Sequence, residues 1–489
     1  MTAPTAALSA AELPHITGCR TPSYDRSAAV PGVVHVGLGA FARAHVARYC
    51  DDLLGLDGGS PAVIGTSLRS GSTTRALVPQ DGLYTLVETD GRRRESRIVG
   101  SVTRLAHGAA ATIDAIAAEA TTAVTMTITE KGYHHAPGRG RLDLDDPAVT
   151  HDVSHPDEPR TAAGVLVAAL RRRRDAGRRG LAIVSCDNLP ANGAVTAAVV
   201  ADLAAATEPD LAAWIAAHVA FPSTVVDRIV PAPTDGDRRF VAERLGLRDA
   251  APVLAETHCS WVIEATPGLP AWHRVGARVV HDVTPWQQRK LRLVNAPHSA
   301  LAYLGALAGH ATIDAAATDP ALARFVAALA TQEIVPTLMP IDGGSGEDEG
   351  ADITTTLARF ANPALGHRTR QVAADGSQKL RPRILDTIAD RRATDGSVDR
   401  LALVVAAWMA WVAQSTRGGH RLDDPLTGQL TATVQAAGTR PADLAAALLD
   451  TPAVVDPDVA ADPAVRTAVT RALSLIDRRG AAAAVRALT

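Results

Sequence analysis

The sequence predicts two domains, an α/β domain with a mostly parallel sheet and a mostly α-helical domain after it. First, 489 residues exceed what one hydrophobic core usually holds together. Second, short apolar runs typical of buried strands alternate with alanine-rich helical stretches up to about Pro285. Third, long Ala- and Leu-rich stretches of helical periodicity follow Pro285. We therefore place the domains at residues 29–284 and 285–489.

The individual elements follow from local composition. Residues 1–28 are rich in Ala, Thr, Pro and Ser and are expected to form a flexible lead. The first strand is expected at residues 32–39, where a short apolar run ends in glycine. Further strands are expected at residues 62–68, 83–88, 124–129, 181–186 and 224–230. In the second domain, helices are expected at residues 291–309, 401–414 and 465–488.

Composition argues against several classes of protein. A formal net charge of −3 gives no electrostatic reason to expect a nucleic-acid or membrane partner. The four cysteines show no CxxC pair and no Cys/His ligand spacing, which disfavours disulfides and structural zinc. No apolar stretch approaches the roughly 18 residues that span a bilayer, and the N-terminus lacks a secretory pattern. We expect a cytoplasmic protein with a small-molecule partner; its oligomeric state stays open, with a monomer as one option.

A glycine pattern stands where the first predicted strand turns into a helix. Residues 34–42 are VHVGLGAFA, which contains GxGxxA. Gly37 permits a tight turn, Gly39 lets the backbone approach a pyrophosphate, and small Ala42 allows close packing of helix on strand. Amides at the helix start then face the anion. The pattern predicts a Rossmann-type dinucleotide site; the alternative is a tight turn with a structural role only.

The second predicted strand ends without an acid. Dinucleotide folds often place Asp or Glu about 20 residues after the glycines, to hold the adenosine ribose. Here the strand ends Ser67-Leu68-Arg69-Ser70. Arg69 is therefore a candidate cofactor-binding residue that suits a 2′-phosphate, which leaves NADP open beside NAD.

Residues 290–305, KLRLVNAPHSALAYLG, bring polar groups of catalytic type into one predicted helix. At about 100° per residue, Lys290, Asn295 and His298 fall within one sector of roughly 140°. Removal of a hydride from a carbinol carbon requires that the hydroxyl proton leave, and a lysine in a low-dielectric pocket can have a pKa low enough to take it. An amide and an imidazole beside it can hold the developing alkoxide. A lysine without such neighbours is usually a surface cation.

Seven segments, in order, resemble the signatures of the long-chain mannitol dehydrogenase family of polyol and uronate oxidoreductases. They are GLGAFARAH (residues 37–45), QDGLYTLVE (80–88), TEKGY (129–133), SCDNLPANG (185–193), FPSTVVDRI (221–229), KLRLVNAPH (290–298) and HRTRQVAADGSQKL (367–380). The resemblance spans Val33 to the C-terminus. It implies a Rossmann-type N-terminal domain, a helical C-terminal domain like that of 6-phosphogluconate dehydrogenases, NAD as the cofactor and no catalytic metal.

The resemblance also implies roles for single residues. Lys290 would transfer the proton, while Asn188 and Asn295 would hydrogen-bond the reacting oxygen. Further residues would bind the rest of the substrate: Asp227, His298, Lys379 and Tyr133. At the cofactor, Ala40, Phe41 and Glu130 would join Gly37, Gly39 and Arg69. Without the resemblance, Asn188 would be interpreted as a turn cap, and Glu130 and Tyr133 as structural residues as readily as site residues.

Two positions depart from the family pattern. Relatives tend to have Gly or Ser just before the histidine, whereas Ala296-Pro297 stands here, and proline kinks a helix or marks its start. Relatives often carry an acid three residues before the lysine, whereas Gln287 cannot accept a proton. The reach of His298 and the route of the proton to solvent are therefore open.

The cations favour an anionic substrate. Arg368, Arg370, Lys379 and Lys131 lie in motifs expected near the site and suit a carboxylate or phosphate. The TEKGY and DGSQKL segments also resemble those of fructuronate reductases. The best candidate pair is D-mannonate/D-fructuronate, with D-mannitol/D-fructose and mannitol 1-phosphate/fructose 6-phosphate as alternatives. A non-catalytic dinucleotide-binding sugar sensor, or a decarboxylating dehydrogenase of the 6-phosphogluconate type, fits the motif set less well.

Overall fold

The computed structural model describes residues 6–58, 61–135, 140–341, 348–418 and 420–489. The chain divides into two compact units, Met1–Thr284 and Pro285–Thr489. Each unit has buried apolar residues of its own.

The first unit is built on a five-stranded parallel sheet with the order β5-β2-β1-β6-β7. Its strands are β1 Pro31–Val36, β2 Ala62–Ser67, β5 Val102–His107, β6 Ala123–Met126 and β7 Ala182–Ser185. The chain adds strands on one side of β1 and then, from β6, on the other. The carboxyl ends of β1 and β6 therefore flank a topological switch point, where open α/β sheets bind ligands. The predicted Rossmann-type architecture is confirmed.

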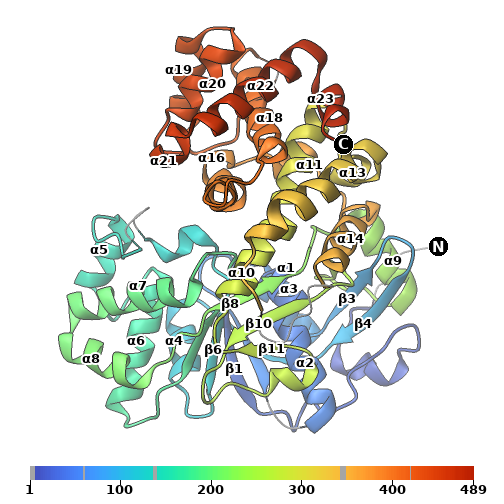
Figure 1. Ribbon diagram of the computed structural model, residues 1–489. Helices are drawn as coiled ribbons and strands as arrows, with labels where there is room; N and C mark the ends of the chain where they lie inside the picture. The colour runs from blue at the N-terminus through green and yellow to red at the C-terminus, as the bar shows by residue number, and fades with distance from the viewer. Residues whose placement is uncertain (1–5, 59–60, 136–139, 342–347, 419) are drawn as a thin grey trace. The chain divides into compact units, whose positions relative to one another are not determined.

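Alternate residues of the sheet pack into two apolar layers. Val34, Val124 and Ile183 belong to a cluster with the helices α4 Ala109–Ala117, α6 Ala162–Asp175, α7 Asn192–Thr207 and α8 Pro209–His218 (Figure 1). Val33 and Val184 belong to a second cluster, which includes α2 Val46–Asp57. The alternation has the two-residue period of a strand. Burial of both faces explains why the strand segments are nearly continuous apolar runs.

Two predicted strands belong to smaller sheets, so the expectation of one mostly parallel sheet is incomplete. β3 Tyr84–Thr89 pairs antiparallel with β4 Arg94–Val99 and parallel with β9 Val253–Glu256. β8 Thr224–Asp227 pairs antiparallel with β10 Ser260–Glu264, which pairs parallel with β11 Arg278–Val280. A short turn joins β3 to β4, and such a connection suits a hairpin but cannot make the crossover of a parallel pair.

The lead segment is packed against the first unit, so the expectation of flexibility is wrong for residues 6–28. Leu8 is fully buried in a small cluster with Leu83, Ile98 and Leu247. Its backbone N–H donates to Arg248 O at 2.9 Å. The 3₁₀ helix η1 Ala10–His15 follows. Composition alone does not predict this packing, because it depends on a few apolar side chains. Residues 1–5 lie outside the described part of the chain.

Several short elements complete the description of the first unit. They are α1 Ala40–Ala44, α3 Ser72–Leu77, η2 Val78–Gln80, η3 Glu130–Tyr133, α5 Pro147–Ser154, α9 Asp235–Leu245 and η4 Trp272–Val275.

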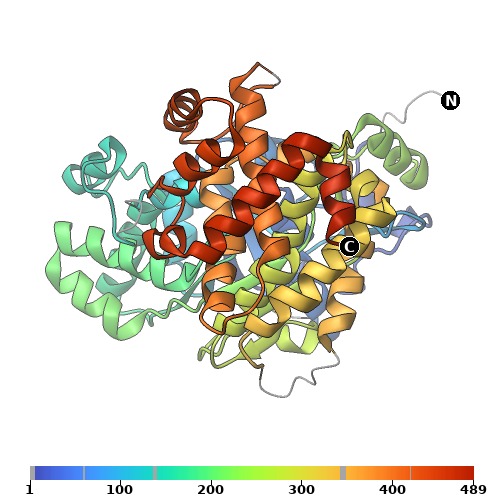
Figure 2. The ribbon, with the colours of Figure 1, turned by 45° about the horizontal axis from the view of Figure 1, so that its top comes forward.

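The second unit is helical, as predicted. Its two longest helices, α18 Asp399–Thr416 and α22 Pro463–Arg479, pack side by side (Figures 1 and 2). α18 also contacts α11 Ala296–Leu307. Residues 401–409 of α18 are buried without interruption, as expected for a helix at the centre of a core.

Shorter helices surround these three. They are α10 Thr284–Arg289, α12 Ile313–Thr318, α13 Pro320–Ala328, α14 Asp348–Phe360, α15 Thr369–Val372, α16 Gly376–Leu380, α17 Asp386–Arg392, α19 Thr427–Ala437, α20 Pro441–Leu449, α21 Pro457–Ala461 and α23 Ala481–Ala487, with 3₁₀ turns η7 Val335–Thr337 and η8 Pro363–Leu365. Across the described residues, no helix combines the length and apolarity needed to cross a membrane.

Candidate functional site

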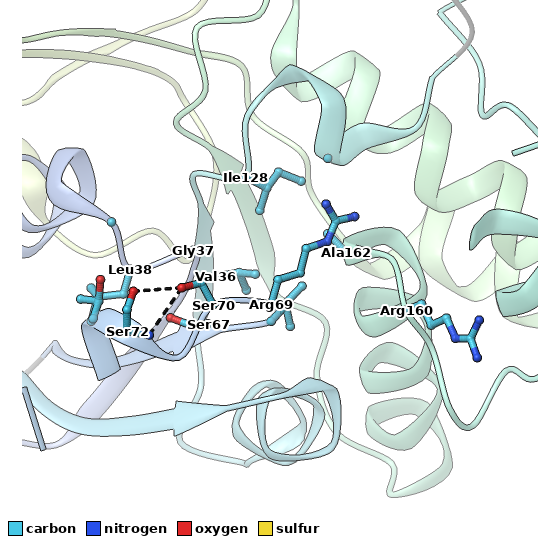
Figure 3. Close-up of a pocket in the computed structure, with 14 residues that line it drawn as sticks. Val36, Gly37, Leu38, Ser67, Arg69, Ser70, Ser72, Ile128, Arg160 and Ala162 are labelled. Carbon is cyan, nitrogen blue, oxygen red and sulfur yellow. Dashed lines mark hydrogen bonds between the residues drawn. The ribbon is translucent and has the colours of Figure 1, made fainter. Parts of the chain in front are cut away.

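A cavity of about 270 Å³ opens at the carboxyl ends of the central strands (Figure 3). It is lined by residues 36–39 after β1, residues 67–70 after β2, and Ile128 and Gly132 after β6. The cavity therefore lies at the switch point of the sheet, where the fold predicts a ligand. The predicted cofactor residues Gly37, Gly39 and Arg69 all line it.

The glycine turn has the geometry that a dinucleotide requires. Gly37 has φ of +94°, and a Cβ atom there would lie 2.1 Å from Thr127 O. A Cβ atom at Gly39 would meet nothing nearer than Gly37 O at 3.8 Å, so the space beside Gly39 is open to ligand atoms. Ala40 and Phe41 begin α1, and the Phe41 ring stacks on His45 at 5.0 Å. Gly37 is therefore needed for the turn itself, and Gly39 for close approach of a ligand.

Buried His35 is linked to this turn by hydrogen bonds through Thr127. His35 Nδ1 lies 2.8 Å from Thr125 Oγ1, and His35 Nε2 lies 3.0 Å from Thr127 Oγ1. Thr127 donates its hydroxyl hydrogen to Gly37 O at 2.8 Å. Thr127 therefore accepts from Nε2–H, and Nδ1 accepts from the Thr125 hydroxyl, which makes His35 a neutral Nε2–H tautomer. Burial lowers the pKa of His35 to about 4.

We expect the free energy of unfolding to fall as the pH falls from about 6.5 towards 4, with a contribution of about 3 kcal/mol from His35. The folded protein holds this imidazole neutral, so the unfolded chain binds more protons and gains stability as the solution becomes acidic. Urea unfolding at pH 7 and pH 4.5 measures the effect. His35→Gln should flatten the pH dependence, whereas His15→Gln, at an exposed position, should not. Equal slopes in the wild type and His35→Gln would contradict this origin.

Asp187, which the sequence analysis did not single out, joins the loops after β6 and β7. Its carboxylate accepts hydrogen bonds from Ile128 N at 3.0 Å, Thr129 N at 2.9 Å and the Tyr133 hydroxyl at 2.8 Å. Burial raises the pKa of Asp187, while these hydrogen bonds lower it. The three contacts hold the strained loop at Thr129, whose φ is +65°. Its position as an acid next to Asn188 in the SCDNLP segment is the sequence feature from which Asp187 could have been identified.

Tyr133 has a structural position, which corrects the prediction that it contacts the substrate. Its side chain is buried, and its hydroxyl group bonds both Asp187 and Ser185 Oγ, the latter at 2.5 Å. Both bonding directions of the phenol are thereby used inside the protein. Glu130 is exposed at the start of η3 and is not part of the cavity lining, so its cofactor role stays a prediction.

The remaining site residues predicted in the first unit lie at strand ends. Asn188 is exposed in the loop after β7. Asn192 fixes this loop: its amide nitrogen donates to Asp187 O at 3.1 Å, and its amide oxygen accepts from Thr224 N at 2.9 Å. Asp227 ends β8, and its carboxylate lies 3.3 Å from His258 Nε2. Buried Asn192 thus joins the loop after β7, which carries Asn188, to the start of β8, whereas Asp227 lies at the other end of that strand.

In the second unit, the predicted catalytic helix contains a π turn. Lys290–Asn295 forms the π segment η5, and α11 follows it directly. A π turn closes i→i+5 hydrogen bonds, so Lys290 and Asn295 lie about one turn apart. His298 is three residues further along α11, on the same face as Asn295. The geometry differs from the predicted α-helix, yet the three side chains still share one side.

Prolines accompany all three π segments of the described chain. Pro297 follows η5, Pro336 follows η6 Leu329–Ile334, and Pro382 lies inside η9 Arg381–Leu385. A proline lacks the amide hydrogen that an α-helix would use, so the register of the helix shifts locally. Pro297 therefore does not end the helix, which continues as α11 to Leu307.

Positive charge surrounds His298 within the second unit. The His298 ring stacks on Phe360 with centroids 4.7 Å apart. Burial lowers the pKa of His298 well below its usual value, and neighbouring basic side chains lower it further: His367, Arg383, Lys379 and Arg359. His298 Nε2 and Asn295 Nδ2 are buried without a hydrogen-bond partner in the described structure. Buried polar atoms are usually hydrogen-bonded, so both atoms are candidates for hydrogen bonds to a ligand.

The cations nearest His298 differ from those singled out in the sequence. Arg370 is exposed on α15 and acts on His420, so it is not grouped with His298. Lys379 also acts on the pKa of His298; its ammonium group donates to Ala374 O at 2.7 Å and lies 3.6 Å from Asp375 Oδ2. Arg383 is a further member that sequence reasoning missed; it donates to Ser299 Oγ at 3.0 Å. Its position about one helical turn after the DGSQKL segment is the sequence feature from which Arg383 could have been identified.

No cluster of three or more His, Cys, Asp or Glu side chains suited to a metal ion is found within the residues that the structure describes.

Comparison with known proteins identifies both units. Residues 31–273 match the mannitol dehydrogenase Rossmann domain, and residues 282–477 match the mannitol dehydrogenase C-terminal domain. The D-mannonate oxidoreductase of Escherichia coli is 39% identical over 96% of this chain and 97% of its own length. The mannitol 2-dehydrogenase of Aspergillus terreus is 34% identical over 94% of each chain.

A solved structure agrees with these matches. The mannitol 2-dehydrogenase of Pseudomonas fluorescens, in a ternary complex with NAD and D-mannitol, superposes with a TM-score of 0.86. The two chains are 32% identical and each is covered to 99%. The resemblance drawn from the sequence motifs is confirmed.

Proposed function

Because this chain belongs to the mannitol dehydrogenase family, we propose that it is an NAD-dependent oxidoreductase for linear polyols or sugar acids. It interconverts a secondary alcohol and the corresponding ketone. Its preferred pair is D-mannonate and D-fructuronate. The 39% identity to a D-mannonate oxidoreductase over nearly the whole chain supports this choice.

The observation that carries the preference for a sugar acid is the positive charge around His298. Two guanidinium groups, an ammonium group and an imidazole act on this ring. A carboxylate in such surroundings makes charge-assisted hydrogen bonds, which are stronger than those of a neutral hydroxyl group.

The nucleotide cavity supports the choice of cofactor class. The open space beside Gly39 and the tight turn at Gly37 suit a pyrophosphate at the switch point of the sheet. NAD, when bound, supplies the acceptor for the hydride. The chain itself has to position the carbinol and remove its proton.

In this proposal, Lys290 takes the hydroxyl proton of the carbinol. Asn188 and Asn295 donate hydrogen bonds to the oxygen as its negative charge grows. The unpartnered amide nitrogen of Asn295 supports that role. His298, kept neutral, bonds a neighbouring hydroxyl group through Nε2, and Asp227 and Lys379 bind more distant groups. The reaction uses no metal ion.

A comparison of three ketones tests the substrate. Purified protein and NADH are mixed with D-fructuronate, D-fructose or D-fructose 6-phosphate, and the nicotinamide absorbance is followed. We expect kcat/KM for fructuronate to exceed that for fructose by at least about 100-fold, the effect of one or two charge-assisted hydrogen bonds. A higher kcat/KM with either other ketone would overturn the assignment. NADH binding without turnover of any ketone would favour a sensor.

A pair of arginine variants tests the origin of this preference. Arg359→Gln, next to His298, should raise KM for fructuronate and leave KM for fructose nearly unchanged. Arg370→Gln removes the same charge beside His420 and should change neither value. Equal effects of the two variants would argue against a carboxylate at this position.

A further inference from the structure

The end of β2 presents a positive charge and hydroxyl groups to the nucleotide cavity. Arg69 extends from this strand end towards Ile128 and Ala162 (Figure 3). Ser70 and Ser72 also line the cavity. Among the described residues that form its lining, none is an aspartate or a glutamate.

Arg75 adds a second guanidinium group to this corner. A Cβ atom at Gly71 would lie 2.6 Å from Arg75 Nη1 and 3.2 Å from the His107 ring, so both side chains flank this backbone. The hydroxyl oxygens of Ser70 and Ser72 are 2.9 Å apart, and both residues are exposed. Residues 69–75 therefore carry two guanidinium groups, and the hydroxyl groups of Ser70, Ser72 and Thr73 line the cavity beside them.

Arg69 has a weak partner within the protein. Its Nη2 atom lies 3.5 Å from His134 Nε2, at the limit of a hydrogen bond. His134 in turn bonds Asp146 through Nδ1 at 2.8 Å. In the described part of the chain, no carboxylate forms an ion pair with Arg69. An arginine in this situation keeps its donors available for an anion.

We propose that this cavity also binds NADP(H), with the 2′-phosphate of the adenosine ribose held by Arg69, Arg75, Ser70 and Ser72. An acid at the end of the second strand holds the ribose hydroxyls of NAD, and its negative charge opposes a 2′-phosphate. That position here carries Arg69, so the repulsion is replaced by attraction. The inference rests on the nucleotide site of the proposed function but not on its sugar substrate.

Binding measurements test this directly. NADH and NADPH are titrated into the full chain and followed by tryptophan fluorescence, with 2′-AMP and 5′-AMP as competitors. We expect NADPH to bind at least as tightly as NADH, and 2′-AMP to compete better than 5′-AMP. Arg69→Asp should raise the Kd of NADPH by at least about 30-fold, since it exchanges a charge-assisted pair for a like charge.

The controls separate the 2′-phosphate from general charge effects. Arg92→Asp makes the same charge change in the exposed turn between β3 and β4 and should alter neither Kd. NADH binding reports that Arg69→Asp is folded; if it is lost, Arg69→Ser and Arg75→Ser take its place. The inference is overturned if the Kd of NADPH is at least 100-fold higher than that of NADH, or if these variants leave the Kd of NADPH unchanged. Either result leaves the proposed function unaffected. Failure of both nucleotides to bind overturns both.

Discussion

Replacing Lys290 with alanine is expected to lower kcat by about 10²- to 10⁴-fold, the range that general acid–base catalysis contributes. Without an amine, the carbinol proton has no acceptor when the hydride leaves. The nucleotide cavity is formed by residues of the first unit alone, so NADH affinity should stay as in the wild type. Steady-state kinetics in both directions, with NADH titration, measure the two effects separately.

Lys290→Arg distinguishes a base from a fixed charge. A guanidinium group keeps the positive charge but does not lose a proton in proteins, so this variant should be as slow as alanine. Recovery of the rate in Lys290→Arg would mean that Lys290 acts only through its charge. Wild-type turnover in Lys290→Ala would refute the proposed mechanism altogether.

The sequence predicts the order of these groups along the chain but not the geometry of the helix that carries them. Periodicity assumes 3.6 residues per turn, whereas Lys290–Asn295 forms a π turn. A single π turn shifts the phase of the hydrophobic pattern only once, and in a short helix this shift cannot be told from ordinary irregularity of the pattern. Pro297 is the one local signal, and a proline alone predicts a kink or the start of a helix rather than a π turn.

Residues with a supporting role were the hardest to predict. Asp187 and Asn192 lie in the SCDNLPANG segment, but their roles depend on backbone groups of residues 128, 129 and 224, which are distant in sequence. Tyr133 was predicted to bind the substrate, but its hydroxyl group serves the same loop contacts. The glycine turn was predictable because its requirement is local: Gly37 has to adopt a positive φ directly after a strand.

That requirement makes Gly37→Ala the second variant with a large expected effect. A Cβ atom at Gly37 would lie 2.1 Å from Thr127 O, so the turn after β1 has to move. We expect the Kd of NADH to rise by at least about 100-fold, because the displaced backbone enters the space that the pyrophosphate needs. The free energy of unfolding should fall by about 2–4 kcal/mol, from the strained φ and the overlap together.

Gly276→Ala is the matched control for backbone strain. Gly276 has φ of +99°, close to the +94° of Gly37, but a Cβ atom there would meet nothing within 4 Å. This variant should lose only about 1 kcal/mol of stability and bind NADH normally. If both variants bind NADH equally well, the turn at Gly37 does not hold the cofactor. If only Gly37→Ala loses NADH binding, the contact between this turn and the loop after β6 determines the shape of the nucleotide site.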